Sequence, residues 1–525
     1  MSLLRASANI GSFTLLSRIL GFVRDQLIAK MLGAGMLSDA FLTAFKIPNF
    51  MRQLFAEGAF NAAFVPLYNS TRAGEGEEAA RLFAREVHAV LLVILLALSV
   101  LGIVFMPELM VVLAPGFDKD PEKFRLTVLL TRITFPYILF ISLVSLQGGI
   151  LNSIGKYTAV AATPVLMNVC LIFAMFALGP FTPTMAHALA IGVMISGVTQ
   201  YLWLFYYCRR AGEGPRFAWP KMTANVRNLL RIVGPAALGS SATQINLIIN
   251  TSIASFFAAG MSILYYSVRI EELPFGVIGI AVSTALLPML SRQIREGSID
   301  KAMHSQNRAL ELSLMFGLPA TVALLVIPQP IVSVIYEHGK FTAQNTQETV
   351  TALLAYTLGL PAALAAKIFA STFYANHDTK TPVRIAMTCV AVNLVLNLTL
   401  IWPVGYVGLA LSTSIASWVN ACMLAKALKK RSLFVPDTTL RFRLPRMLAA
   451  CSIMGVALWG MNYVLAGYLA GGLLSKIVAL SLLIGGGGAV YGVSLLMLRV
   501  MRISELKAYA RPRTVKTVAP GADGQ

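Results

Sequence analysis

The chain has 525 residues, of which 57% are hydrophobic and only 13% are charged. A soluble domain carries about 25% charged residues, so this composition excludes an ordinary soluble protein. Apolar runs of roughly 20 residues, the length of a membrane-spanning helix, recur from end to end. The runs are continuous rather than alternating, which favours helices over the strands of a membrane barrel. We therefore expect an all-α integral membrane protein with about fourteen transmembrane helices.

The net charge of +20 is concentrated in alternate connections between the predicted spans. A nucleic-acid-binding protein would need a basic face on a soluble domain, and the sequence offers no such domain. An excess of Lys and Arg in one set of loops follows the positive-inside rule instead. This pattern predicts that both termini are cytoplasmic and that the number of spans is even.

The predicted spans are joined by connections too short for a folded domain outside the membrane. In chain order they cover residues 8–30, 36–66, 83–113, 124–151, 157–179, 184–208, 226–258, 262–290, 309–336, 347–374, 382–402, 405–427, 445–468 and 474–499. We expect an N-terminal lobe of six spans (1–220), a C-terminal lobe of six spans (221–431), two extra spans (432–503) and a disordered tail (504–525).

A weak internal repeat with a period of about 220–225 residues supports the two lobes. Lys46 corresponds to Arg269, and Pro66 corresponds to Pro288. Six spans separate the members of each pair, so the repeats are parallel. Transporters built from two such halves bind substrate between them and work by alternating access.

The stretch from Ser17 to Pro66 carries eight charged residues within two predicted spans. A charged side chain at a helix centre costs about 2.5–3.5 kcal/mol, so it should face a partner or a water-filled cavity. On the first of these spans, Arg18 and Asp25 share a face and Arg24 is adjacent. On the second, one face carries a polar stripe of Asp39, Thr43, Lys46, Asn49, Gln53 and Glu57, with Arg52 beside it.

The eighth predicted span repeats this arrangement with Arg269, Glu271 and Glu272 just before Pro274. Charged helices interrupted by proline or glycine at corresponding positions of two halves indicate a binding site between them. Arginine suits phosphate, because its planar fork binds two oxygens at once. We therefore expect a basic cavity for an anionic substrate.

A structural interpretation of these charges stays open. The acids Asp25, Asp39 and Glu57 could simply pair with neighbouring arginines and lysines and lock the helices together. At least one positive charge would then be left over, and the polar surface is broader than a single ion pair needs.

Catalytic motifs are missing from the sequence. The five histidines are scattered without an HExxH pattern, and neither a nucleotide-binding P-loop nor a GxSxG motif occurs. The five cysteines lie in or beside apolar runs without CxxC spacing, which predicts neither disulfides nor metal sites. We expect no enzyme, no cofactor and no bound metal.

Several segments resemble the MurJ (MviN) lipid II flippases of the multidrug/oligosaccharidyl-lipid/polysaccharide exporter superfamily. They are SRILGFVRD, SDAFLTAFKIPNFMRQLFAEGAFNAAFVP, APGF at 114–117, TFPYIL at 134–139, LNS at 151–153 and EHGKF at 337–341. The resemblance covers essentially the whole chain, and AEGAFxxAFVP is its most specific motif.

This resemblance implies a function in cell-wall biogenesis and cell shape. The protein would move lipid II, the undecaprenyl-pyrophosphate-linked disaccharide-pentapeptide, from the cytoplasmic to the periplasmic leaflet of the bacterial inner membrane. The implied substrate-binding residues are Arg18, Arg24, Asp39, Lys46, Asn49, Arg52, Glu57, Arg269 and Glu272. The implied partners are lipid II, membrane lipids and possible cell-wall synthesis proteins.

The resemblance also implies a groove for the lipid tail on the last two spans. Some members of the family have a sodium site with acidic residues, where this chain offers Gln244, Asn246, Asn393 and Asn397 and no Asp. Two other functions remain as alternatives. One is a drug/cation or other polysaccharide-lipid exporter of the same fold, and the other is a membrane scaffold for cell-wall enzymes.

Overall fold

The fold is taken from a computed structural model that describes residues 3–56, 59–214 and 219–501. Side chains up to residue 9 and those of residues 51–56, 59, 62, 234–245 and 280 lie outside this description. All regular elements in the described residues are helices, and no strand occurs among them. The predicted all-α class is confirmed.

The helices follow the apolar runs closely. In chain order they are α1 (Leu3–Leu32), α2 (Met36–Ala56), α3 (Ala59–Gly74), α4 (Glu77–Val104), α5 (Met106–Leu113), η1 (Pro115–Lys119), α6 (Pro121–Thr134), α7 (Tyr137–Ser153), α8 (Tyr157–Ala161), α9 (Thr163–Ala177), η2 (Gly179–Phe181), α10 (Met185–Arg210), α11 (Ala224–Ala254), α12 (Gly260–Pro274), η3 (Phe275–Gly279), α13 (Ile280–Arg295), α14 (Ile299–Val326), α15 (Pro328–Tyr336), α16 (Ala343–Thr357), α17 (Leu360–Ala375), α18 (Lys380–Val404), α19 (Val407–Lys430), α20 (Thr438–Val464), α21 (Ala466–Leu469) and α22 (Leu473–Met497).

Within the described part of the chain, ten helical segments are long and apolar enough to cross a membrane. The number becomes eleven if α16 and α17, which are bent by 41° at their junction, form one span. The predicted second span, 36–66, falls on α2 and α3. Helix α2 continues through Pro48. The number fourteen remains a prediction.

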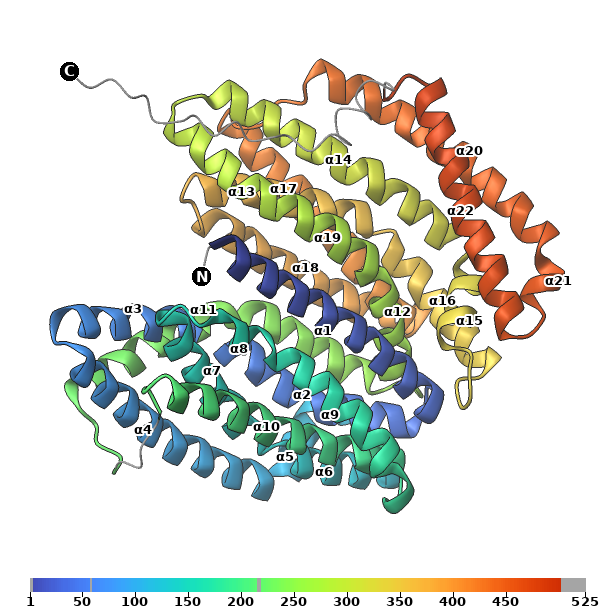
Figure 1. Cartoon of the computed structure of the whole chain (residues 1–525). Helices are drawn as coiled ribbons and strands as arrows, with labels where there is room; N and C mark the ends of the chain where they lie inside the picture. Colours follow the sequence, from blue (N-terminus) through green and yellow to red (C-terminus); the bar gives the residue numbers. More distant parts are fainter. Residues whose placement is uncertain (1–2, 57–58, 215–218, 502–525) are drawn as a thin grey trace, which may run out of the picture. The chain divides into compact units, whose positions relative to one another are not determined.

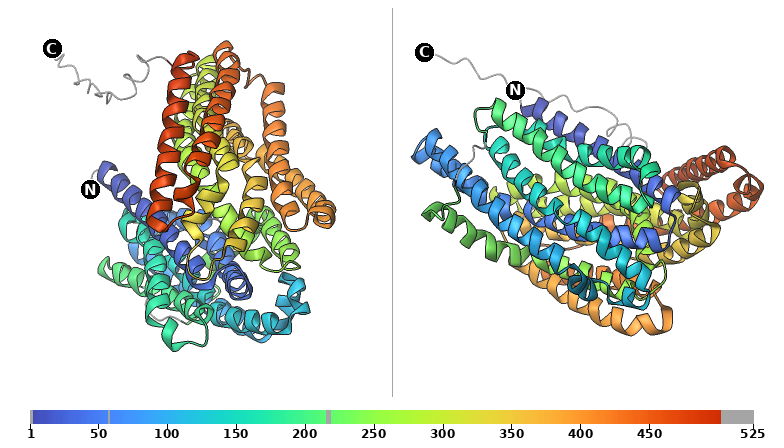
Figure 2. Two further views of the ribbon diagram at one scale, coloured as in Figure 1. Left: turned by 90° about the vertical axis from the view of Figure 1, so that its right-hand side faces the viewer. Right: turned by 90° about the horizontal axis from the view of Figure 1, so that it is seen from below.

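The chain divides into two compact units. Unit 1 comprises Met1–Leu273, Val332–Gly359 and Thr379–Asn420, and unit 2 comprises Pro274–Ile331, Leu360–Asp378 and Ala421–Gln525. In unit 1, α10 packs against α7 and α9, while α2 packs against α6 and α7 (Figure 1). In unit 2, α20 packs against α14 and pairs with α22 (Figures 1 and 2).

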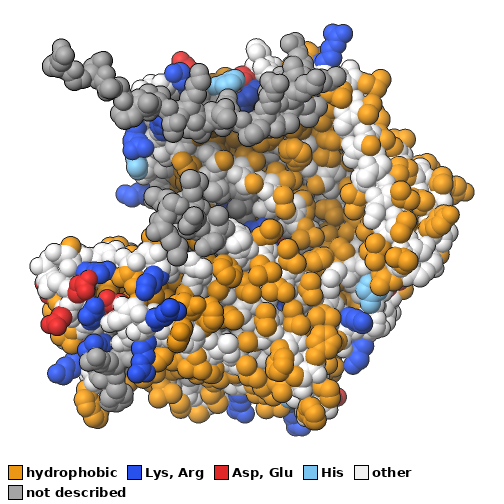
Figure 3. All heavy atoms as spheres, in the orientation of Figure 1, with side chains coloured by type: hydrophobic (Ala, Val, Ile, Leu, Met, Phe, Trp, Pro, Cys, Tyr) orange, Lys and Arg blue, Asp and Glu red, His pale blue; other side chains and the backbone are white. Residues whose placement is uncertain are grey.

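Charge and hydrophobicity separate on the surface of unit 1. Lys and Arg side chains gather near the ends where α3 and α4 meet, and hydrophobic side chains cover the sides of the helices (Figure 3). On α4, for example, Leu96 and Leu101 are exposed. Apolar helix sides between charged ends are the pattern of a protein surrounded by lipid.

The end of α1 contacts the segment between α15 and α16, and both lie in unit 1. The Lys340 amide donates a hydrogen bond to the Lys30 carbonyl at 2.9 Å. Asn345 Nδ2 donates to the Ala34 carbonyl at 3.2 Å, and the Ala34 amide donates to Asn345 Oδ1 at 3.4 Å. We call these contacts, between residues 30–34 and 339–345, the latch.

Two glycines allow the backbones of the latch to meet. Gly33 has a φ of +73° and Gly339 a φ of +61°, which other residues rarely adopt. A Cβ on Gly33 would lie 2.5 Å from the Lys340 carbonyl oxygen, and one on Gly339 would collide with the carbonyl of Lys30. The glycine of the EHGKF segment is therefore required by close backbone approach.

Candidate functional site

A buried ion pair on α1 forms the centre of the candidate site. Arg24 and Asp25 are both buried, although they are neighbours in sequence. Arg24 donates from Nε and Nη2 to Asp25 Oδ1, at 3.0 and 2.7 Å. Its Nη1 donates to Asn168 Oδ1 of α9 at 2.9 Å. Three hydrogen bonds to two acceptor oxygens thus hold the guanidinium of Arg24 and leave it little freedom to move.

Helix α12 brings a second arginine to the same carboxylate. Arg269 Nε lies 3.2 Å from Asp25 Oδ2, without the alignment of a hydrogen bond. The guanidinium carbon lies 5.0 Å from the ring centroid of Tyr265, and Tyr265 Oη donates to Asp25 Oδ1 at 2.9 Å. Arg269 Nη1 also donates to Glu272 Oε2 at 2.8 Å.

The two arginines differ in how easily they could exchange partners. The side chain of Arg24 is 7% exposed, whereas those of Arg269 and Glu272 are 38% and 49% exposed. Exposed ion pairs contribute little stability, so the pair of Arg269 and Glu272 can open at low cost. The arrangement is a buried, hydrogen-bonded arginine beside a second, more exposed arginine whose ion pair with Glu272 an anion could replace.

Asp39 lies in a separate buried cluster. Its side chain is fully buried, and Lys123 Nζ of α6 lies 2.6 Å from Asp39 Oδ2. Asp39 Oδ1 accepts hydrogen bonds from the amide and the hydroxyl of Ser262 on α12, at 2.8 and 2.7 Å. Lys123 Nζ also lies 4.1 Å from the ring centroid of Phe117. Asp39 therefore connects α2 to α6 and α12, as the structural interpretation expects.

Removing the charge of Asp39 is expected to destabilise the folded protein. The variant Asp39→Asn leaves Lys123 buried without a counter-ion, and breaking such a pair costs about 3–5 kcal/mol. The double variant Asp39→Asn/Lys123→Met, which removes both charges, should recover much of that loss. Thermal unfolding of the purified variants measures both effects. Equal unfolding midpoints for Asp39→Asn and the parent would contradict a structural role. Arg125→Gln, on the exposed side of α6, is the matched control and should unfold at the same temperature as the parent.

The remaining members of the predicted set have different surroundings. Lys46 is half-buried, and its Nζ donates to Thr251 Oγ1 of α11 at 2.8 Å without forming an ion pair to a described carboxylate. Asn49 is half-buried one turn further along α2. Arg18 is exposed and makes neither a hydrogen bond nor an ion pair with the described residues. The side chain of Arg52 and the whole of Glu57 lie outside the described residues.

Four partners of the predicted residues escaped the sequence analysis: Asn168, Lys123, Ser262 and Tyr265. Asn168 is a single amide in the apolar sequence of α9, and that isolated polar residue was a usable signal. Lys123 stood in the mixed-charge segment DKDPEK, which resembles an ordinary loop. Asp25 was recognised as a charge of the first span but was not included among the binding residues.

Two of the amide residues considered for a sodium site, Asn393 and Asn397, contact each other, and Asn397 also contacts Asn250. Asn397 Nδ2 of α18 donates to Asn250 Oδ1 of α11 at 2.6 Å and to Asn393 Oδ1 at 3.0 Å. Over residues 3–56, 59–214 and 219–501, no group of three or more His, Cys, Asp or Glu side chains could hold a metal ion. The expectation of no metal stays a prediction.

The fold is that of a class of helical membrane transporters. A multidrug resistance MATE transporter of the MOP superfamily, in an inward-facing conformation, matches with a TM-score of 0.64 over 79% of this chain and 95% of its own. Its sequence identity of 14% supports the fold alone. A structure titled lipid II flippase MurJ, inward closed conformation, matches with a TM-score of 0.78 and 27% identity over 96% of this chain and 99% of its own.

Sequence comparison identifies the family within that class. The profile of the family described as lipid II flippase MurJ matches residues 28–480. A probable lipid II flippase MurJ from Rhizobium meliloti (strain 1021) is 40% identical over 100% of both chains. One from Rickettsia prowazekii (strain Madrid E) is 36% identical over 95% of this chain and 99% of its own. The chain belongs to the MurJ family, a family of transporters, and is a multi-pass inner-membrane protein.

Proposed function

We propose that the protein moves lipid II from the cytoplasmic to the periplasmic leaflet of the inner membrane by alternating access. The single observation that carries the proposal is the cluster in which Arg24 of α1 and Arg269 of α12 share the carboxylate of Asp25. Two guanidinium groups suit a pyrophosphate, which offers oxygens to both. The family and the names of the relatives support this substrate.

In this mechanism Arg269 binds the pyrophosphate in the inward-open state, and the fixed guanidinium of Arg24 adds a second positive charge beside it. Glu272 competes with the substrate for Arg269, because it already binds that guanidinium. Pyrophosphate leaves on the periplasmic side when Arg269 returns to Glu272. The other predicted residues, Arg18, Lys46, Asn49, Arg52 and Glu57, form the remaining polar surface of the cavity. A membrane potential would supply about 2.3 kcal/mol per charge per 100 mV.

The proposed architecture has fourteen spans, with lobes at 1–220 and 221–431. The positive-inside pattern supports cytoplasmic termini. The latch lies at the far end of α1, one predicted span away from the N-terminus, and would therefore be periplasmic. The latch joins the first predicted lobe to the second, which supports an inward-facing state with its periplasmic side closed. The tail at 504–525 lies outside the described residues.

The two last spans, within 432–503, are proposed to bind the lipid tail. They correspond to α20 and α22, which pair within unit 2. Large apolar side chains are exposed on both helices, among them Val456, Trp459 and Leu474. Such a surface suits a polyprenyl chain. Contacts with cell-wall synthesis proteins remain a prediction.

A leaflet-resolved measurement of lipid II tests the function. Depletion of the protein in cells is expected to increase lipid II in the cytoplasmic leaflet and to decrease the pool that an externally added probe can reach. Restored expression should reverse both changes. An unchanged leaflet distribution together with new sensitivity to toxic cations would instead identify a drug/cation exporter of the same fold.

A further inference from the structure

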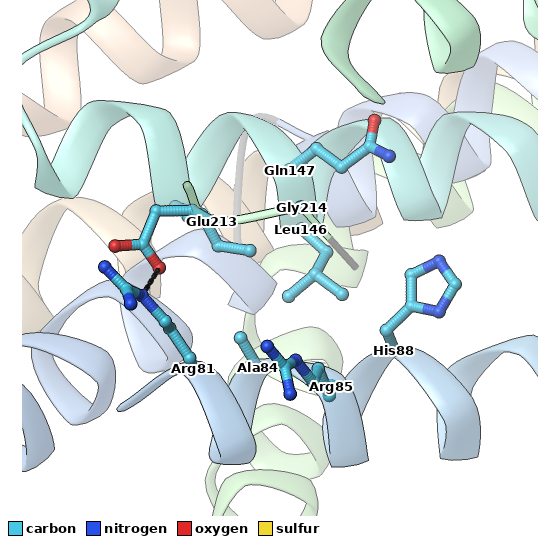
Figure 4. Close-up of a pocket in the computed structure, with 9 residues that line it drawn as sticks. Arg81, Ala84, Arg85, His88, Leu146, Gln147, Glu213 and Gly214 are labelled. Atoms are coloured by element: carbon cyan, nitrogen blue, oxygen red, sulfur yellow. Dashed lines mark ion pairs between the residues drawn. The ribbon is translucent and has the colours of Figure 1, made fainter. Parts of the chain in front are cut away.

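A polar pocket separate from the cluster of Arg24, Asp25 and Arg269 lies within unit 1, between α4, α7 and the turn that follows α10. Arg81, Arg85 and His88 line it from one face of α4, and Gln147 and Leu146 face them from α7 (Figure 4). The inner cavity has a volume of about 10 Å³, enough for one water molecule. Arg81 and Arg85 also line an adjoining outer groove of about 480 Å³.

Gln147 of α7 lines the inner cavity and carries the group that the contacts of the fold leave unexplained. Its side chain is fully buried, and neither the amide nitrogen nor the amide oxygen has a hydrogen-bond partner among the described residues. An unsatisfied buried amide costs about 1–3 kcal/mol. A water molecule in the inner cavity would satisfy it and would extend its hydrogen bonding toward the outer groove.

The charges around the pocket leave one arginine without a counter-ion. Arg81 Nε lies 3.3 Å from Glu213 Oε2, and that same oxygen accepts a hydrogen bond from Tyr68 Oη at 3.1 Å. Glu77 is engaged by Arg81 and by a neighbouring arginine of α3. Half-buried Arg85 forms neither an ion pair nor a hydrogen bond with any described residue, and its Nε is buried without a partner.

Two other groups complete the surroundings of Arg85. His88 is held near Tyr201, with 3.4 Å between His88 Nε2 and Tyr201 Oη. Glu78 lines the outer groove but forms no ion pair with a described residue. The two arginines and the two glutamates that line the cavities balance in number, but Glu213 lies against Arg81, so no carboxylate of the described residues contacts the half-buried guanidinium of Arg85.

We propose that the outer groove binds a phosphate-bearing anion, held by Arg85 with Arg81 at the rim and linked to Gln147 through the inner water. Phosphate matches the planar fork of arginine better than a point-like anion does. The pocket lies at the N-terminal end of α4, beside exposed Leu82 and ahead of the exposed apolar face of that helix. The phosphate of an anionic lipid would place its acyl chains along that face.

Binding of two probes to the full-length protein tests the proposal and distinguishes its sources of phosphate. One probe is phosphatidylglycerol in phosphatidylcholine nanodiscs, counted as retained lipid by native mass spectrometry. The other is inorganic phosphate added to delipidated protein, followed by thermal unfolding. Arg85→Gln is expected to weaken binding about tenfold, because it removes a charge-assisted contact.

Two further variants keep the test decisive. Gln147→Glu puts a carboxylate in the wall of the same cavity as Arg85, so the folded protein should lose anion binding, and thermal unfolding measures what the buried charge costs in stability. Arg384→Gln removes an exposed positive charge at the start of α18 and should bind both probes as the parent does. An Arg85-dependent effect with lipid alone identifies a headgroup site, and one with both probes identifies a general phosphate site. Unchanged binding of both probes by Arg85→Gln and Gln147→Glu would refute the proposal.

Discussion

Arg269→Ala is expected to reduce lipid II flipping at least about a hundredfold while the protein still inserts in normal amounts. Arg269 is the more exposed of the two arginines on Asp25, and its ion pair with that carboxylate lacks hydrogen-bond alignment. It can therefore turn to a pyrophosphate, whereas Arg24 stays fixed. Two charge-assisted hydrogen bonds of about 1.5–3 kcal/mol each would be lost with it. The measurement is transfer of labelled lipid II in proteoliposomes.

Two companion variants separate substrate binding from folding. Arg269→Lys keeps the charge but not the fork, so it should recover only part of the activity. Glu272→Gln removes the competing carboxylate, and we expect tighter retention of lipid II with slower release. Arg384→Gln is the matched control for loss of one arginine. Full activity of Arg269→Ala would remove the central cluster from the mechanism, even if the leaflet measurement on the parent supported flipping.

The sequence predicts the helices well because hydrophobic runs are a local property. The helical segments from α4 to α22 follow runs that a reader can find without the structure. The pairing of charges is a different matter, since it depends on contacts between distant helices. Asp39 meets Lys123, and Arg24 meets Asn168, across 84 and 144 positions of the chain.

The candidate site shows the same limit in more detail. Helical spacing placed Asp39 and Lys46 on one polar stripe, which suggests that they share a cavity. In the structure Asp39 is buried against α6 and α12, while Lys46 reaches Thr251 of α11. Lys46 Nζ also lies 3.9 Å from the sulfur of Met261 on α12, so the two residues share one neighbouring helix but differ in their main partners. The repeat was more informative, because it singled out Arg269 as the counterpart of Lys46.

The glycines of the latch illustrate what neither pattern nor charge could predict. Gly339 belongs to the EHGKF segment that resembles the MurJ family, but the sequence does not show why a glycine is needed there. The structure shows that the carbonyl of Lys30 approaches too closely for a side chain at this position. That contact connects residues about three hundred positions apart, within unit 1. Because it joins the two predicted lobes, it suggests where the transport cycle can be stopped.

Cross-linking the latch is expected to abolish flipping until the cross-link is reduced. Asn345 exchanges two hydrogen bonds with the backbone of Ala34, so cysteines at these positions should react with each other or with a short bifunctional reagent. Alternating access requires the periplasmic side to open, and a covalent latch prevents that opening. Transport by Ala34→Cys/Asn345→Cys should therefore fall to background after oxidation and recover after treatment with a reductant.

The background and the control decide how this result is interpreted. The five native cysteines, of which Cys422 is exposed, are first replaced so that only the introduced pair can react. Gln344→Cys/Glu348→Cys places a pair one turn apart on α16, where a short bifunctional reagent can bridge it. That cross-link leaves the latch free to separate and should leave transport intact. Complete cross-linking of the pair at 34 and 345 with undiminished flipping would show that these segments stay together throughout the cycle. In that case the lobes would have to open elsewhere, and the two-lobe rocking mechanism would fail for this protein.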